Sequence, residues 1–140
     1  MRKIITTLLT AAALALPVVD ASAATTKAAA RKIVVTKRFS GSVVSVDRWG
    51  NLQVTIVVRK TTTITGTKKK VTRKLTAIAV PLYPNHTDRS VFINENALPT
   101  LKSEALRAQR ADIDMVSGAT DTSEAFARSL QAAILKARKA

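Results

Sequence analysis

The residues best suited to chemistry lie together near the C-terminal end of the chain, in the segment Ser117-Gly118-Ala119-Thr120. A short extended piece, residues 112–116, precedes the segment, and a strongly helical stretch begins at Thr122. A glycine followed by small residues at such a junction lets backbone N–H groups approach an anion closely, and the helix adds its positive N-terminal end. The pattern therefore predicts an anion-binding site.

The same residues have a plainer interpretation as a helix cap. Thr120, or the pair Asp121 and Glu124, would then satisfy the first N–H groups of the helix. For an arbitrary Ser-Gly-Ala-Thr segment the cap is the commoner explanation, because such caps are frequent at helix starts. The choice between the two depends on the surrounding residues.

A longer motif surrounds the segment. Residues 114–120 read Asp-Met-Val-Ser-Gly-Ala-Thr and fit the pattern Asp-x-x-Ser/Thr-Gly-Ala-Thr. At average composition the five fixed positions arise by chance on the order of 10⁻⁴ to 10⁻³ times in a chain of this length. The motif resembles the signature of the FMN-binding domain family, which includes exported flavin-carrying subunits of the sodium-pumping NADH:quinone reductase and of the Rnf complexes.

Segments upstream of the motif extend this resemblance to roughly residues 39–136. Together they are similar to the small single-domain exported members found in high-GC Gram-positive bacteria. The segments are Arg48-Trp49-Gly50, Leu52-Gln53-Val54, Tyr83-Pro84-Asn85-His86, Ile93-Asn94, Ala97-Leu98-Pro99-Thr100-Leu101 and Glu104-Ala105-Leu106.

The resemblance implies FMN as the cofactor and Thr120 as its attachment point. In the family, a flavin transferase that uses FAD and Mg²⁺ joins FMN through a phosphoester to the last threonine of the motif. Gly118 would allow close approach of the backbone to the phosphate, next to Ala119. Ser117 would donate to a phosphate oxygen, and Asp114 would be recognised by the transferase.

For the isoalloxazine ring, the resemblance points to residues 94–101 as a wall, with Leu98 and Pro99 packing against the ring and Asn94 hydrogen-bonding to it. Trp49 is expected to be a turn or core aromatic rather than a flavin contact. One departure from the family is Asp121, where members often carry an aromatic or aliphatic residue, since a carboxylate beside a phosphate is repulsive.

The strands that must position the motif are visible in the hydrophobic pattern. Leu52, Val54, Ile56 and Val58 alternate with polar residues, as in a strand with one buried face. We expect residues 51–82 to form one long hairpin that turns at Thr65-Gly66, with the later half of its second strand buried on both faces. An earlier strand over residues 39–46, joined through a turn at 47–51, completes a three-stranded antiparallel meander.

The pattern changes to a helical period after Pro84. Residues 89–97 predict a short helical turn, and a helix follows from about Pro99 to Gln109. The last helix starts near Thr122 and carries an apolar stripe along one side. Acidic residues lie at its beginning and basic residues at its end, as the helix dipole favours. The predicted fold class is α+β: an antiparallel β-meander with a long hairpin, packed by two or three helices of which the last is C-terminal.

The N-terminal residues indicate export. Arg2 and Lys3 precede an apolar stretch, residues 4–16, and an Ala21-Ser22-Ala23 site, so we predict a secretory signal peptide over residues 1–23. We expect a basic Ala/Thr/Lys linker over residues 24–38 and the FMN-binding domain over 39–138. Because the chain has no Cys, disulfide scaffolds, thiol redox motifs and Cys-based zinc sites are excluded. With a single His, we expect no metal site.

The charge is concentrated in the first half of the exported part. The chain carries 23 Lys and Arg against 9 Asp and Glu, a formal net charge of +14. Of these, 13 basic residues and one acidic residue fall between positions 24 and 74. An exported chain meets little nucleic acid, so anionic wall polymers or lipid headgroups are the expected partners, unless the charge only keeps the domain soluble.

Two functions follow from these observations. The first is an exported FMN-binding domain that relays electrons from a membrane or envelope donor, with no independent substrate chemistry and no catalytic residues of its own. The second is a flavin-free module that uses its basic hairpin to hold anionic wall polymers or a membrane surface.

Overall fold

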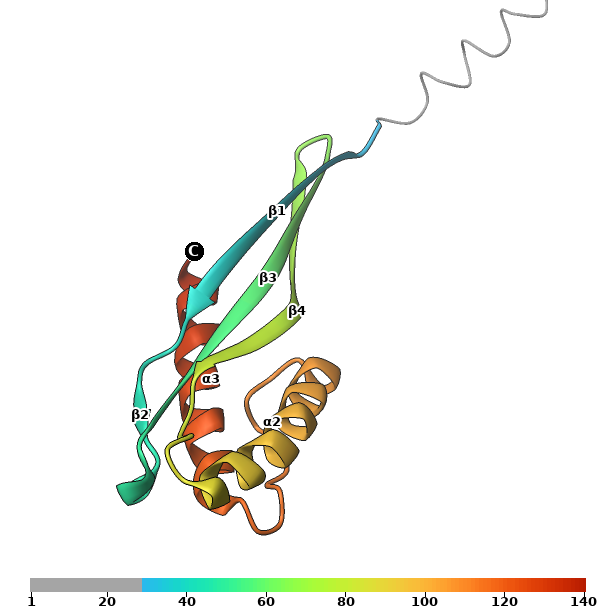
Figure 1. Cartoon of the computed structure of the whole chain (residues 1–140). Helices are drawn as coiled ribbons and strands as arrows, with labels where there is room; N and C mark the ends of the chain where they lie inside the picture. The colour runs from blue at the N-terminus through green and yellow to red at the C-terminus, as the bar shows by residue number, and fades with distance from the viewer. Residues whose placement is uncertain (1–28) are drawn as a thin grey trace, which may run out of the picture.

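A long antiparallel hairpin is the central feature of the computed structural model, which describes residues 29–140 (Figure 1). The strands are β1 (Arg31–Ser40), β2 (Val44–Ser45), β3 (Asn51–Thr65) and β4 (Lys68–Leu82), with the short 3-10 helix η1 (Asp47–Trp49) between β2 and β3. The two α-helices, α2 (Asp88–Ala108) and α3 (Thr120–Lys139), follow the sheet. The fold is α+β with a C-terminal helix, as predicted. The predicted signal peptide and the first residues of the predicted linker lie outside the described residues.

The sheet is built around β3. This strand pairs antiparallel with β4 on one side and with β1 and β2 on the other. The hairpin between β3 and β4 turns at Gly66, whose φ of +62° lies in the left-handed region that glycine adopts without strain. The prediction of one hairpin over residues 51–82 is confirmed.

The first strand begins earlier than predicted. Residues 31–38, which we expected to be linker, belong to β1 and pair with residues 57–64 of β3. The strand then ends at Ser40, and the predicted continuous strand over 39–46 is broken before β2. The reason is tertiary: a long β3 offers free backbone groups along its whole edge, and β1 satisfies them although its own side chains are nearly all exposed.

The later half of β4 is not buried on both faces, contrary to the prediction. Leu75 is buried, but Ala77 and Ala79 are exposed, and Ile78 and Val80 are half-buried. The register with β3 shifts at Thr76, so the alternation of the strand changes there and brings Ile78 to the core side. The later half of β4 is therefore covered on one face only.

Helix α2 runs through Pro99 without interruption, where the sequence predicted two separate helical pieces. Thr87 caps its first turn by accepting a hydrogen bond from the Ser90 N–H at 3.1 Å. Proline lacks the N–H that would bond four residues back, and the helix changes direction near its middle (Figure 1). Leu98 and Leu101, on either side of Pro99, are buried in the core, and this packing holds the helix together across the missing bond.

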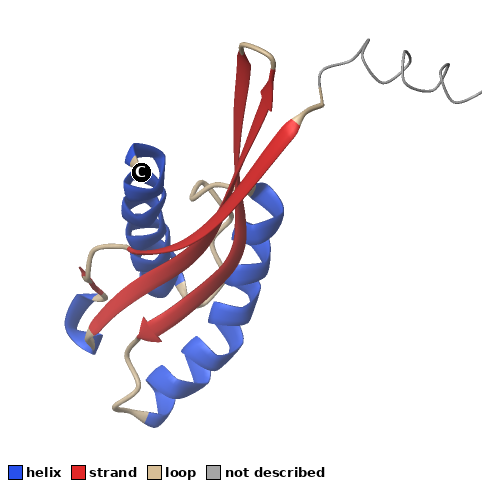
Figure 2. Cartoon of the chain, turned by 90° about the horizontal axis from the view of Figure 1, so that it is seen from above, coloured by secondary structure: helices blue, strands red, loops and turns tan. Residues whose placement is uncertain are grey.

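Helix α3 carries the predicted apolar stripe and packs across the sheet (Figure 2). Phe126, Leu130 and Ala133 are fully buried against the inward-facing residues of β3. Helix α2 packs against β4 and α3, so both helices share one core. None of the described helices is long and apolar enough to cross a membrane.

Candidate functional site

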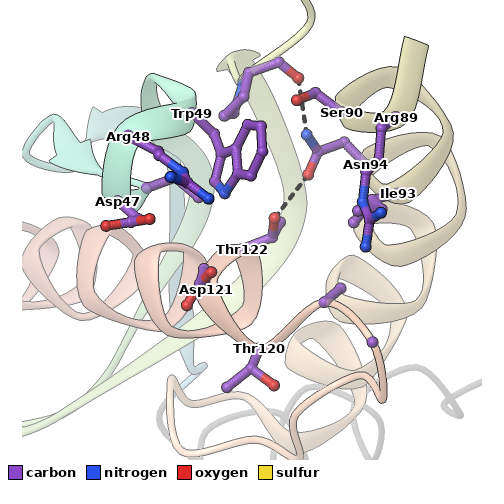
Figure 3. Close-up of a pocket in the computed structure, with 14 residues that line it drawn as sticks. Asp47, Arg48, Trp49, Arg89, Ser90, Ile93, Asn94, Thr120, Asp121 and Thr122 are labelled. Atoms are coloured by element: carbon purple, nitrogen blue, oxygen red, sulfur yellow. Dashed lines mark hydrogen bonds between the residues drawn. The ribbon is translucent and has the colours of Figure 1, made fainter. Parts of the chain in front are cut away.

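A cavity of about 340 Å³ lies where the first turn of α3 meets η1 and the beginning of α2 (Figure 3). Figure 3 shows η1 on one side of the cavity, α2 on the other and the start of α3 below them. The lining residues from η1 and its neighbour are Val46, Asp47, Arg48 and Trp49; those before and in α2 are Pro84, Arg89, Ser90, Ile93 and Asn94; those at α3 are Gly118, Ala119, Thr120, Asp121 and Thr122. The volume is in the range of small-molecule sites, roughly 300–1,000 Å³.

Thr120 is the first residue of α3, and its side chain does not cap the helix. The N-cap position is Ala119, which offers no side-chain hydrogen bond. Ser123 instead donates both its backbone N–H and its hydroxyl to the Ala119 carbonyl, at 2.9 and 2.7 Å. The interpretation of Thr120 as a cap is therefore wrong. Its exposed hydroxyl makes no hydrogen bond with any described residue, and Thr120 is one of the residues that line the cavity, at its lower edge in Figure 3.

The backbone around Thr120 has the properties of an anion site. In the first turn of α3, the N–H groups of residues 120–122 find no acceptor among the described residues, as is usual at helix N-termini. Gly118 has a φ of +80°, which disfavours any other residue, and a side chain placed there would meet no atom within 4 Å. Open space thus lies beside the donors.

A buried amide fixes the position of α3 relative to the other walls. Asn94 is 2% exposed; its Nδ2 donates to the Pro84 carbonyl at 2.8 Å, and its Oδ1 accepts from the Thr122 hydroxyl at 2.9 Å (Figure 3). These bonds connect the loop after β4, helix α2 and the first turn of α3. Asn94 therefore acts on the site by positioning Thr122, and with it Thr120.

Charged and aromatic groups that the sequence analysis did not assign to the site also line the cavity. Arg48 and Trp49 come from η1, and the guanidinium carbon of Arg48 lies 5.1 Å from the centre of the Trp49 ring. Arg89 comes from the opposite wall (Figure 3). The half-buried Trp49 is at a turn, as predicted, and it also contributes an aromatic surface to the cavity. The signal was available, since Arg48-Trp49-Gly50 was among the segments that carried the resemblance.

The other predicted site residues divide between the cavity and its surroundings. Gly118, Ala119 and Asn94 line the cavity with Thr120, as does Asp121. Ser117 and Asp114 are exposed and do not line it.

Leu98 and Pro99 do not line the cavity either. Leu98 is buried in the core, and Pro99 is exposed on α2. The continuous helix is the reason: both residues lie at least one turn beyond Asn94, whereas a separate helix starting at Pro99 could have faced the ring. The wall predicted from residues 94–101 is reduced to the beginning of α2, including Ile93.

The arrangement fits a ligand with an anionic group and a flat apolar ring. Unpaired N–H groups and the open space at Gly118 suit a phosphate. Arg48 and Arg89 add positive charge, which the carboxylates of Asp47 and Asp121 in the same lining oppose, so the backbone donors carry the preference for an anion. Trp49 and the apolar side chains of Val46, Pro84 and Ile93 provide surfaces for a ring, as flavin sites require.

Comparison with known proteins agrees with this geometry. The family model described as FMN-binding domain matches residues 47–135, which include every lining residue of the cavity except Val46. No curated protein matched the chain. The match covers more than half of the chain, so the protein belongs to the FMN-binding domain family and is a flavoprotein whose cofactor is FMN.

Proposed function

We propose that this protein is an exported electron-transfer domain whose FMN is attached through a phosphoester to Thr120. FMN supplies reversible one- and two-electron chemistry when bound. The residues of this chain bind and orient it, and they hold Thr120 where the bond is made.

The observation that carries the proposal is the exposure and the lack of hydrogen bonding of the Thr120 hydroxyl among the described residues. This hydroxyl is exposed, engaged with no described residue and adjacent to the free N–H groups of the first turn of α3. The other threonine of this turn, Thr122, is 4% exposed and is bonded to Asn94. Thr120 therefore combines access for a modifying enzyme with a place for the phosphate charge.

The proposed attachment uses a flavin transferase with FAD and Mg²⁺. The Thr120 oxygen forms a bond to the phosphorus of the FMN half of FAD, the bond from that phosphorus to the bridging oxygen of the pyrophosphate breaks, and AMP leaves. The threonine proton passes to a base of the transferase. Because a threonine hydroxyl is a weak nucleophile by itself, its activation belongs to the transferase and its metal ion.

We propose that the bound FMN relays electrons and that the domain has no substrate chemistry of its own. The Ser90 hydroxyl is hydrogen-bonded to the Thr87 hydroxyl at 2.9 Å. The Thr122 hydroxyl donates a hydrogen bond to Asn94 Oδ1, also at 2.9 Å. Neither is paired with a base that would activate it. A cofactor fixed at Thr120 would be reoxidised by a second protein, so we propose an envelope electron donor and acceptor as partners.

Export is proposed from the predicted signal peptide over residues 1–23. Attachment of FMN would then take place outside the cytoplasm. The alternative of a flavin-free binding module does not account for the family match. The basic hairpin of the protein is a separate surface from the cavity.

The test is to produce the protein with a flavin transferase and measure its intact mass. The unmodified sequence should gain one FMN phosphoester, and Thr120→Ala should gain none, because the bonding oxygen is gone. Thr120→Ser restores a hydroxyl at the same place and should recover part of the adduct.

Two matched controls separate site chemistry from loss of structure. Ser103→Ala removes an exposed hydroxyl on α2, outside both the motif and the cavity. Thr122→Ser keeps the hydroxyl that donates to Asn94. Both should carry the adduct. Flavin still bonded to Thr120→Ala, or no adduct on the unmutated protein, would overturn the assignment.

A further inference from the structure

Strands β1, β3 and β4 carry a concentration of positive charge without any acidic residue. We call this group of side chains the basic ribbon. Its eleven members are Arg31, Lys32, Lys37, Arg38, Arg59, Lys60, Lys68, Lys69, Lys70, Arg73 and Lys74. Ten of them are exposed and Lys60 is half-buried.

Lys60 donates to an Ala140 oxygen at 3.2 Å, and the other ten side chains form no ion pair or hydrogen bond with the described part of the chain. The two ion pairs found there join Arg107 to Glu104 and Arg128 to Glu124, and both lie on the helices. The hairpin end of the ribbon projects away from α2 and α3 (Figure 1). Like charges so close together repel one another, so the ribbon favours an anionic partner.

The charge lies on both faces of the ribbon. Side chains of paired residues point to the same face, and alternate residues point to opposite faces. The register therefore places five members on the face that continues from the core and six on the outer face. The core-side members are Arg31, Lys37, Lys60, Lys69 and Arg73; the outer members are Lys32, Arg38, Arg59, Lys68, Lys70 and Lys74.

The charge is also spread along the ribbon. From Arg31 to Arg38 the strand rises by about 23 Å, at ~3.3 Å per residue. Exposed charges are screened beyond about 8–10 Å at physiological ionic strength. A bilayer that meets the tip end-on would thus interact mainly with the residues near the turn, and one that lies flat against the ribbon would interact with a single face.

We infer that the basic ribbon binds a flexible linear polyanion that carries phosphate groups along its length. Such a polymer follows the ribbon for its whole length and passes from one face to the other. A flexible polymer can therefore contact basic side chains on both faces of the ribbon, whereas a planar surface contacts only some of them.

The position of the ribbon leaves the FMN site accessible. The hairpin turn lies at one end of the molecule, whereas η1 and the start of α3, which line the cavity, lie at the other (Figure 1). A polymer bound along the ribbon would retain the domain while the flavin remains open to its redox partners.

The experiment measures binding of long-chain inorganic polyphosphate to the full chain at several salt concentrations. Three triple variants, each lowering the charge by three, are compared with the unmutated protein. They are the core-side triple (Arg31→Gln, Lys69→Gln, Arg73→Gln), the outer triple (Lys32→Gln, Lys70→Gln, Lys74→Gln) and a control triple on α2 and just after it (Lys102→Gln, Arg107→Gln, Arg110→Gln).

Both ribbon triples should weaken binding at low salt, and each should reduce the slope of log K against log salt by about 2, because three phosphate contacts are lost. The control triple should have a much smaller effect. FMN content should be the same in all four proteins, so failure of this inference would be distinct from failure of FMN attachment.

Three results would overturn the inference. Equal weakening by the control triple would mean that net charge alone attracts the polymer. Binding to phosphatidylglycerol vesicles with dependence on only one ribbon triple, and none to polyphosphate, would make the partner a membrane surface. Tighter binding of duplex DNA than of polyphosphate, at equal phosphate concentration, would exclude a flexible polymer as the preferred partner.

Discussion

At the scale of single residues, the proposed FMN site combines groups that would contact the ligand with groups that position them. Thr120, Arg48 and Arg89 line the cavity, and their side chains make no hydrogen bond with the residues that the structure describes. Asn94 instead forms hydrogen bonds to Pro84 and Thr122. Because both of these bonds go to protein groups, we propose a positioning role for Asn94; a hydrogen bond from Asn94 to the ring stays a prediction.

Trp49 offers the aromatic surface against which the flavin ring would pack. We expect Trp49→Ala to weaken FMN binding by about 1 kcal/mol, or about fivefold, because an aromatic contact of this order is lost. The measurement is flavin fluorescence quenching in a Thr120→Ala background, where FMN is bound without a covalent link. Trp49→Phe keeps a ring and should bind more tightly than Trp49→Ala; equal affinities for the two would contradict a ring contact.

At the scale of secondary-structure elements, Ser129 joins α3 to β3 and to the segment between β1 and β2. Its hydroxyl accepts from the Val54 N–H at 2.8 Å and donates to the Ser42 carbonyl at 2.7 Å, and its side chain is fully buried. Gly41 fits against the same residue, since a Cβ there would overlap the Ser129 carbonyl oxygen. The junction of α3 with β3 and with the segment after β1 therefore depends on one hydroxyl and one missing side chain.

Ser129→Ala should lower the free energy of unfolding by about 1–3 kcal/mol, because the buried Val54 N–H loses its acceptor. Urea denaturation measures this change. Ser103→Ala is the matched control: Ser103 is exposed on α2, so the same substitution should be neutral or slightly stabilising. Equal effects of the two substitutions would show that the Ser129 bonds contribute nothing to stability.

At the scale of the whole molecule, the hairpin end and the cavity proposed for FMN are separate regions. Residues 61–72 contribute no buried side chain, and the cavity is lined entirely by residues outside them. The core lies between the helices and the other half of the sheet.

Replacement of residues 61–72 by Asn-Gly, a pair that favours a two-residue hairpin turn, should leave FMN content unchanged, because Lys60 and Arg73 already face each other in the register. The melting temperature should change by only a few degrees, since about 1 kcal/mol shifts it by 4–8 °C in a domain of this size. The flavin-to-protein ratio and thermal unfolding measure both effects. Loss of flavin from the shortened protein would show that the two regions are coupled.

The sequence by itself determined the features that depend on neighbouring residues. The alternation around Val54 and Ile56, the turn at Thr65-Gly66 and the stripe of α3 each follow from local periodicity or turn chemistry, and all three predictions are confirmed. The motif that ends at Thr120 is likewise contiguous, so it could be recognised without a structure.

Tertiary structure decided what depends on segments that are distant in sequence. Trp49 borders the cavity because η1 folds next to the start of α3, and neither segment encodes that contact locally. Leu98 lies in the core rather than at the cavity because packing holds α2 continuous through Pro99. Residues 31–38 become a strand only because β3 presents an open edge to them. In each case the energy of long-range packing or pairing outweighs a weaker local preference.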